Sequence, residues 1–203
     1  MLPLVEVTTG IPDLDWTPNF TPKTATLQEM AKQAVLRRPI WDLEFAFKPL
    51  RMIEVDVPQP TGKMQRKLIW YMVYRVSNRG LALSPTATED EFGHKTYDIE
   101  KVNYPTRRFF PHAVLESREY KKSYLDRIIP AAQKAIQERE NPGTKIHNSI
   151  EMTRIKIPLS DERIDRGVWG VITWEDVDPR LDFFSVYLRG LTNAFKFVDP
   201  PGA

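Results

Sequence analysis

An acidic turn toward the C-terminal end of the chain holds the side chains best suited to bind a cation. Glu175, Asp176, Asp178 and Asp182 lie between two β-rich runs, and carboxylate oxygens are the ligands that Ca²⁺ prefers. The turn lacks the glycine and the bidentate glutamate of an EF-hand loop. Asp178 and Asp182 are equally suited to hydrogen-bond their own turn. We therefore expect no bound metal or other cofactor, and these four residues are the only metal-site candidates.

Residue types that commonly catalyse reactions are present, but without the spacing that catalysis needs. His94, His112 and His147 lie far apart and form no H-x-H or H-E-x-x-H pattern. Ser149 and Ser160 lie outside any G-x-S-x-G nucleophile elbow. No base is therefore placed beside a nucleophile, and we expect a protein without catalytic residues.

Two alternatives to a simple binding module remain open. A tryptophan that points outward from a sheet could stack on a sugar ring, although the default role of a strand tryptophan is core packing. A glycosidase would also need two carboxylates about 5 to 9.5 Å apart across a cleft. A carbohydrate-active hydrolase or carbohydrate-binding module is one alternative, and a calcium-dependent adhesion module built on the acidic turn is the other. The tryptophans in predicted strands are Trp41, Trp70, Trp169 and Trp174.

Composition narrows the class of protein further. The 203 residues are 41% hydrophobic, which is enough for an ordinary core. Twenty-nine basic and 27 acidic residues leave a net charge of +2, so we expect no nucleic-acid partner. The absence of cysteine excludes disulfides and zinc–thiolate sites. No run approaches the roughly 18 apolar residues of a membrane span. A periplasmic or cell-envelope location is favoured if a secretory signal has been removed.

Residues 1–25 are predicted to form an extended N-terminal arm. Three prolines lie among threonines and other small polar residues between Thr8 and Thr24, a composition typical of extended chain. Trp16 and Phe20 are its large aromatic side chains. If they dock on a neighbouring molecule, the arm would make the protein a homo-oligomer. Protein is thus the expected partner, with Trp16 and Phe20 as the candidate contact residues.

The rest of the chain is predicted to be one β-rich domain over residues 26–198, followed by a tail at 199–203. Two short helices are expected near 26–38, which opens with a capping box at Thr26 and Glu29, and near 130–140, which has Pro130 in its first turn. Residues 67–76 are apolar on both parities and predict a central strand buried on two sides. Other predicted strands lie at 40–47, 52–57, 81–83, 97–99, 113–116 and 150–159, the last with a β-bulge.

The two final β-rich runs predict a hairpin. Residues 168–174 and 184–189 each alternate with a period of two. Asp178 and Pro179 predict a turn between them, so we expect these strands to pair with each other.

Several segments together resemble a family of uncharacterised bacterial proteins with a GLTNA-type C-terminal motif. More distantly, they are similar to immunoglobulin-like sandwich modules of bacterial envelope proteins. The resemblance implies a mainly β, immunoglobulin-like two-sheet sandwich with two short accessory helices. It supplies no catalytic residue, substrate or cofactor. A sandwich with a proline-rich arm and no convergent polar residues is built to present surface, so we expect a noncatalytic binding or scaffolding module of the cell envelope that recognises protein. The matching segments are Trp41–Ile53, Leu68–Asn78, Ile129–Glu140, Trp169–Trp174 and Gly190–Phe195.

Overall fold

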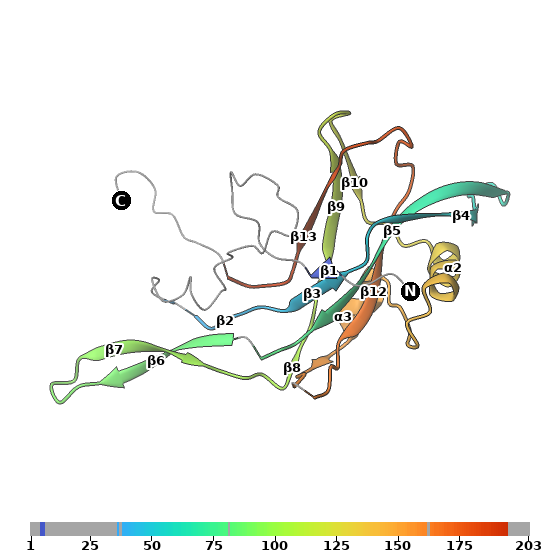
Figure 1. Cartoon of the computed structure of the whole chain (residues 1–203). Helices are drawn as coiled ribbons and strands as arrows, with labels where there is room; N and C mark the ends of the chain where they lie inside the picture. The colour runs from blue at the N-terminus through green and yellow to red at the C-terminus, as the bar shows by residue number, and fades with distance from the viewer. Residues whose placement is uncertain (1–4, 7–35, 37, 81, 162, 195–203) are drawn as a thin grey trace.

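The computed structural model describes residues 5–6, 36, 38–80, 82–161 and 163–194. Antiparallel sheets make up the largest regular part of these residues, accompanied by two helices (Figure 1). The predicted mainly β sandwich is therefore confirmed. Trp16, Phe20, the rest of the N-terminal arm beyond Val5–Glu6, the 199–203 tail and nearly all of the predicted 26–38 helix lie outside the described residues.

The largest sheet is organised around one long strand. Residues 69–74 of β5 are buried on both faces, which confirms the predicted central strand. β4 pairs with its first half and β3 with its second half, while β12 runs along the other side. β1 extends the sheet beyond β3. The strands are β1 (Val5–Glu6), β3 (Glu44–Phe47), β4 (Arg51–Pro58), β5 (Met64–Ser77) and β12 (Val168–Trp174).

A second sheet packs on one face of the first. It has the order β10–β9–β13, with β9 (His112–Ser117), β10 (Lys122–Leu125) and β13 (Ser185–Arg189). Aromatic side chains fill the space between the sheets, and the Tyr74 ring lies 5.0 Å from that of Phe45 and 5.9 Å from that of Phe109. Leu115 and Trp174 are also fully buried in this core. Packing of this kind is the usual interior of a β-sandwich.

A helix covers the opposite face of the large sheet. Helix α2 (Pro130–Glu140) begins with proline and is followed by Asn141 in the left-handed conformation, as the sequence predicts. Its Ala132 and Ile136 pack on Ile69 and Tyr71 of β5. The molecule therefore has three layers, namely helix, large sheet and small sheet. Among the described residues, no helix is long and apolar enough to span a membrane.

The strand predicted at 150–159 is wrong over most of its length. Residues Ser149–Arg154 form helix α3, and only Ile157–Pro158 is a strand, β11, which pairs with β8 (Thr106–Arg107). A capping box explains the helix. The Asn148 side chain accepts from the Glu151 amide at 2.9 Å, and the Asn148 amide donates to the Glu151 carboxylate at 3.1 Å. The parity shift read as a β-bulge is the change from helix to strand.

The capping box should make stability depend on pH. Burial opposes ionisation of Glu151, but hydrogen bonds from Lys145, Gln133 and the Asn148 amide prevail and lower its pKa from 4.5 to about 2. Because the folded state has the lower pKa, the contribution of Glu151 is complete above pH 4.5 and is lost as the pH falls toward about 2. We expect urea unfolding to find Glu151→Gln less stable than wild type at neutral pH, with the difference shrinking below pH 4.5. A difference that stays constant with pH would contradict this assignment.

The predicted hairpin between the last two strands is also wrong. β12 pairs with β5 of the large sheet, whereas β13 pairs with β9 of the small sheet. The predicted turn does form, with the Leu181 amide donating to the Asp178 carbonyl at 3.1 Å. Val177 and Leu181 are nevertheless buried in the core between the sheets. The loop between β12 and β13 crosses from the large sheet to the small sheet because these two side chains are buried between the sheets. The two strands therefore do not pair with each other.

A long hairpin extends away from the packed sheets (Figure 1). It consists of β6 (Ala82–Glu89) and β7 (Lys95–Lys101), and β2 (Ile40–Trp41) pairs with β6 only at Ala82 and Leu83. All seven residues of β7 are exposed. The hairpin is thus supported by the body at its base alone.

Candidate binding surface

The outer face of the small sheet is the most distinctive exposed surface in the described part of the chain. On β9, Ala113, Leu115 and Ser117 are buried against the core, so His112, Val114 and Glu116 point outward. The register places Arg189 opposite His112 and Ser185 opposite Glu116. Strand alternation alone therefore determines which side chains form this face.

An apolar row crosses the middle of this face. Leu125 of β10 and Tyr187 of β13 are the register partners of Val114, one on each side. Leu125 is 61% exposed and Tyr187 is 44% exposed. The outward face of an antiparallel sheet is normally polar. A contiguous apolar row at this position is therefore a feature expected of a contact surface.

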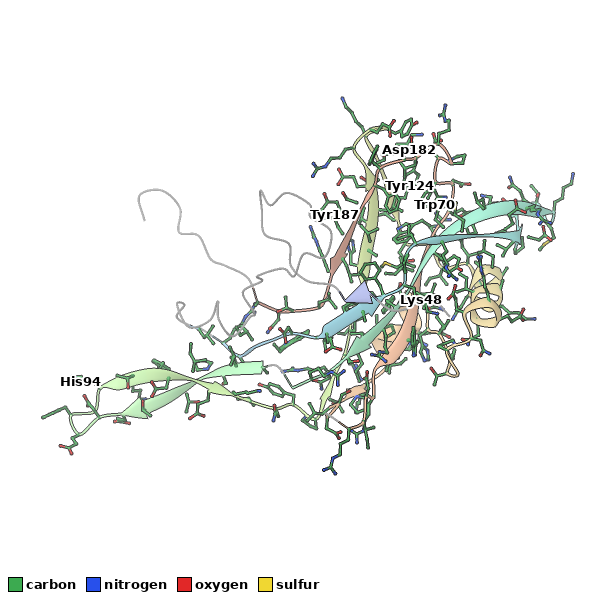
Figure 2. The ribbon with its side chains drawn as sticks, in the orientation of Figure 1. Lys48, Trp70, His94, Tyr124, Asp182 and Tyr187 are labelled. Atoms are coloured by element: carbon green, nitrogen blue, oxygen red, sulfur yellow. The ribbon has the colours of Figure 1, made fainter. Side chains whose placement is uncertain are left out.

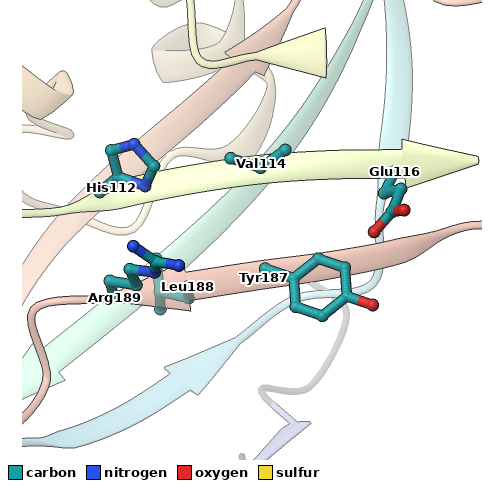
Figure 3. Close-up of a pocket in the computed structure, with 6 residues that line it drawn as sticks. All are labelled: His112, Val114, Glu116, Tyr187, Leu188 and Arg189. Carbon is teal, nitrogen blue, oxygen red and sulfur yellow. The ribbon is translucent and has the colours of Figure 1, made fainter. Parts of the chain in front are cut away.

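Charged groups surround the apolar row. Arg118 lies just beyond β9, and the nearby Tyr187 hydroxyl and Glu116 carboxylate raise the pKa of its guanidinium. Arg189 and His112 lie at the other end (Figure 3). An open hollow of about 450 Å³ is lined by His112, Val114, Glu116, Tyr187, Leu188 and Arg189. We call this surface the sheet face, and it comprises His112, Val114, Glu116, Arg118, Leu125, Tyr187 and Arg189.

The four candidate calcium ligands do not converge. Lys67 Nζ contacts Glu175 at 2.6 Å and Asp176 at 3.1 Å. Asp178 pairs with Arg180 at 2.9 Å, and its hydrogen bonds from Arg180 lower the pKa of Asp178 to about 2. Asp182 is exposed in the loop before β13 (Figure 2). Lysine and arginine thus neutralise three of the candidates, and the described residues contain no cluster of three or more potential metal ligands.

The described tryptophans lend no support to carbohydrate binding. Trp70 and Trp174 are buried, and Trp41 and Trp169 are half-buried. The Trp70 ring packs edge-on against Phe184, with centroids 5.6 Å apart. A sugar-stacking platform requires an exposed indole face. Lys48 and Arg75 lie over the ring of Trp169, and Arg107 lies over the ring of Trp41.

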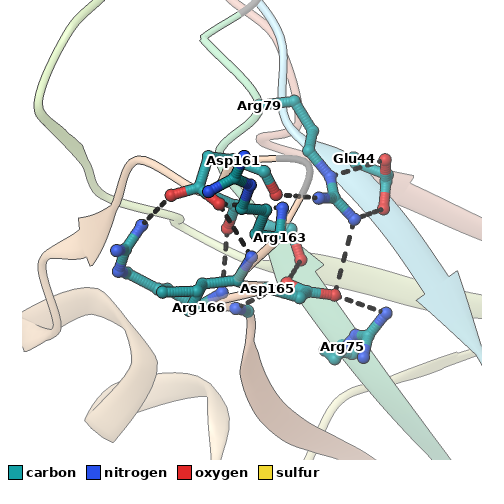
Figure 4. Close-up of polar contacts among 11 residues, drawn as sticks. Glu44, Arg75, Arg79, Asp161, Arg163, Asp165 and Arg166 are labelled. Atoms are coloured by element: carbon teal, nitrogen blue, oxygen red, sulfur yellow. Dashed lines mark hydrogen bonds and ion pairs between the residues drawn. The ribbon is translucent and has the colours of Figure 1, made fainter.

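Near the C-terminal end of β5, the acidic side chains of the large sheet and of the loop before β12 form ion pairs with arginines (Figure 4). Arg79 contacts Glu44 at 3.1 Å, and Arg75 contacts Asp165 at 2.8 Å. Asp165 also accepts from Ser77 at 3.0 Å. Burial opposes ionisation of Asp165, yet hydrogen bonds from the Gly167 amide and Ser77 and the neighbouring arginines lower its pKa. Such fully paired carboxylates anchor the loop before β12 to the sheet and are poorly suited to exchange protons with a substrate.

A second ionic group is buried beneath α2. Glu140 accepts from Lys48 at 2.8 Å, from Arg51 at 2.9 Å and from the Tyr71 hydroxyl at 2.8 Å. Burial opposes ionisation of Glu140, but these partners prevail and lower its pKa. Burial and the hydrogen bond to Glu140 raise the pKa of Tyr71 to about 12. Glu140 and Lys48 are buried with their partners in place, so this group joins the helix to the sheet.

The three histidines stay apart, as their spacing predicts. His94 contacts Asp90 at 3.1 Å in the exposed β6–β7 turn, and His147 lies 3.8 Å from Glu151 beside α3. His112 alone reaches the sheet face. No two of them meet at one site.

The sheet face was missed by reasoning from sequence. Its strands were predicted near 113–116 and 184–189, but both parities of these segments carry apolar residues, such as Val114 beside Leu115 and Tyr187 beside Leu188. The available signal for an exposed apolar surface was that residues alternating with the core residues, such as Val114 and Tyr187, are also apolar. They do not reveal whether another layer of the same chain covers them.

Comparisons with known proteins identify no family. No family model matches the chain, and no solved structure matches it. The chain is similar to the "Ribosome biogenesis protein bop1" of Danio rerio, with 29% identity over 132 residues, or 58% of this chain. It spans only 17% of the length of that curated relative. The match therefore leaves family membership and activity open, and it lends no support to a bacterial or envelope origin.

Proposed function

We propose that this protein is a noncatalytic binding module that recognises another protein through the sheet face. The observation that carries the proposal is an apolar row, in which Leu125 and Tyr187 are exposed and Val114 is half-buried, on a sheet whose other side is core. Tyrosine and arginine are enriched in protein interfaces, and arginine binds both carboxylates and aromatic rings. Tyr187 lies in the apolar row, and the neighbouring Arg118 lies at one end of the face.

The scaffold suits this role because it holds the face rigid. Core residues of β9 pack against the large sheet, which α2 supports from behind. A preformed surface does not have to be ordered when the partner binds, which lowers the entropic cost of association. A location in the cell envelope is part of the proposal and rests on the resemblance to envelope sandwich modules.

Side-chain truncation on the sheet face should weaken binding without harming the fold. We expect Tyr187→Ala and Leu125→Ala each to weaken partner binding by roughly tenfold, as hot-spot residues do. Both side chains project into solvent, so the free energy of unfolding should change by less than about 0.5 kcal/mol. Partner titration and urea unfolding measure the two quantities.

The partner is first found with a photo-crosslinking amino acid placed at position 187. It should form a covalent adduct with a protein in lysate of the source cells, while the same amino acid at the exposed helix position 138 should not. Loss of the adduct in the Leu125→Ala background would link it to the apolar row. Equal yields of crosslinked adduct at positions 187 and 138 would contradict the proposal.

A further inference from the structure

The β6–β7 hairpin lacks the support that such a structure needs. A two-stranded ribbon is marginally stable in water unless one of its faces packs against something. Beyond Leu83 no further strand pairs with β6 apart from β7 in the described part of the chain. This ribbon therefore has a face whose burial would stabilise it.

That face carries an apolar stripe between Lys101 at the base and the Glu89–Lys95 pair near the turn, and it continues the core side of the small β2–β6–β7 sheet. Leu83 is buried against Ile40, and residues of the same parity further out form the register pairs Pro85–Ile99 and Ala87–Tyr97. Tyr97 is 62% exposed, and Phe92 at the turn is 84% exposed. The exposed apolar stripe, which comprises Pro85, Ala87, Tyr97 and Ile99, continues the face that is buried at Leu83, but no other described strand covers it.

The other face of the hairpin is polar and internally satisfied. Thr86 donates to Glu100 at 3.0 Å, and the hydroxyls of Thr88 and Thr96 lie 2.9 Å apart. Such cross-strand pairs suit a face exposed to water. The two faces of the ribbon therefore differ, and only one resembles an interface.

The turn of the hairpin and the sheet face carry opposite charge. Three carboxylates, Glu89, Asp90 and Glu91, surround the turn. Asp98 and Glu100 belong to the polar face, and the two lysines of the hairpin share the parity of the apolar stripe. The sheet face presents Arg118 and Arg189 against the single carboxylate Glu116. Both surfaces are also about the same length, since strands of six and seven residues span roughly 20 Å. Each has an apolar centre, so they match in size and in polarity, and the acidic turn is opposite in charge to the arginines of the sheet face.

We infer that the occupant of the sheet face is the β6–β7 hairpin of a second copy of this chain. This inference rests on the proposed function of the sheet face. Both surfaces are exposed within one chain, and the hairpin extends away from the packed sheets (Figure 1), so the contact forms between copies. The apolar stripe around Tyr97 packs on the row around Val114 at the usual spacing of about 10 Å between sheets. Each copy offers one hairpin and one sheet face, which allows a reciprocal dimer or an open chain.

Sedimentation measurements over a range of protein and salt concentrations test this contact. Wild-type protein is expected to self-associate, more weakly at high salt. Tyr97→Ser on the hairpin and Leu125→Ser on the sheet face should each weaken association by about tenfold or more. Ile150→Ser, an exposed apolar position on α3, is the matched control and should associate like wild type.

Mixing the two variants gives the sharpest test. Tyr97→Ser keeps an intact sheet face and Leu125→Ser keeps an intact hairpin, so an equimolar mixture should form a heterodimer that neither variant forms alone. Circular dichroism confirms that each variant is folded. If Tyr97→Ser does not fold, Phe92→Ser at the exposed turn takes its place, because that side chain packs little within the chain.

Each remaining outcome separates this inference from the proposed function. A wild-type chain that stays monomeric throughout overturns the inference, while the crosslink at position 187 still decides whether the sheet face binds a different protein. Association abolished by Leu125→Ser but unaffected by Tyr97→Ser also overturns it and leaves the sheet face as the binding surface. If the mixture of the two variants forms no heterodimer, the hairpin is not the occupant of the sheet face.

Discussion

Glu140→Ala should lower the free energy of unfolding by about 3–5 kcal/mol, the cost of removing one partner from a buried ion pair. Lys48 is 1% exposed and would be left buried without its counterion. The Tyr71 hydroxyl would lose its acceptor as well. Urea unfolding followed by tryptophan fluorescence measures the effect.

Two further variants separate the buried charge from the helix itself. Glu138→Ala removes an exposed carboxylate from the same helix and should change stability by less than about 0.5 kcal/mol. Replacing Lys48 and Glu140 together by methionine removes both charges and should cost much less than Glu140→Ala alone. If the double variant were as unstable as Glu140→Ala, the uncompensated lysine would not be the cause.

Gly170→Ala should destabilise the sandwich by about 1–3 kcal/mol, the usual cost of overpacking a core. Gly170 on β12 is the register partner of Tyr74 on β5. A Cβ at this position would overlap the Tyr74 ring and lie 2.7 Å from its Cε2. The ring cannot move aside, because it is fully buried between Phe45 and Phe109. Thermal and urea unfolding would both report the loss.

A double-mutant cycle identifies the clash as the cause. In the Tyr74→Leu background the ring is absent, so Gly170→Ala should cost clearly less than it does in wild type. Equal costs in the two backgrounds would mean that the alanine acts elsewhere. If the Gly170→Ala protein were as stable as wild type, the packing around Tyr74 would be able to shift and make room for the added methyl group.

The layered architecture explains why the sheet face is available for binding. The large sheet is covered on one side by α2 and on the other by the small sheet. The small sheet is the outermost layer, so its second face has no further layer over the Val114 row among the described residues. An unpaired outer layer with apolar side chains is where a partner adds most buried area.

Local sequence patterns by themselves determined much of the secondary structure. Pro130 and Asn141 mark the two ends of α2 because each satisfies a local backbone requirement. The apolar run at 69–74 announces a strand buried on both faces for an equally local reason, since its side chains alternate between two dry layers.

Only the tertiary structure decided which strands pair and which surfaces stay exposed. β12 and β13 are close in sequence, yet they join different sheets because burial of Val177 and Leu181 carries the chain across the core. Likewise, Val114 and Leu115 are adjacent apolar residues, and only the position of the large sheet determines which of them is buried. Alternation along a strand assigns residues to two faces, but contacts between distant segments determine which face is covered.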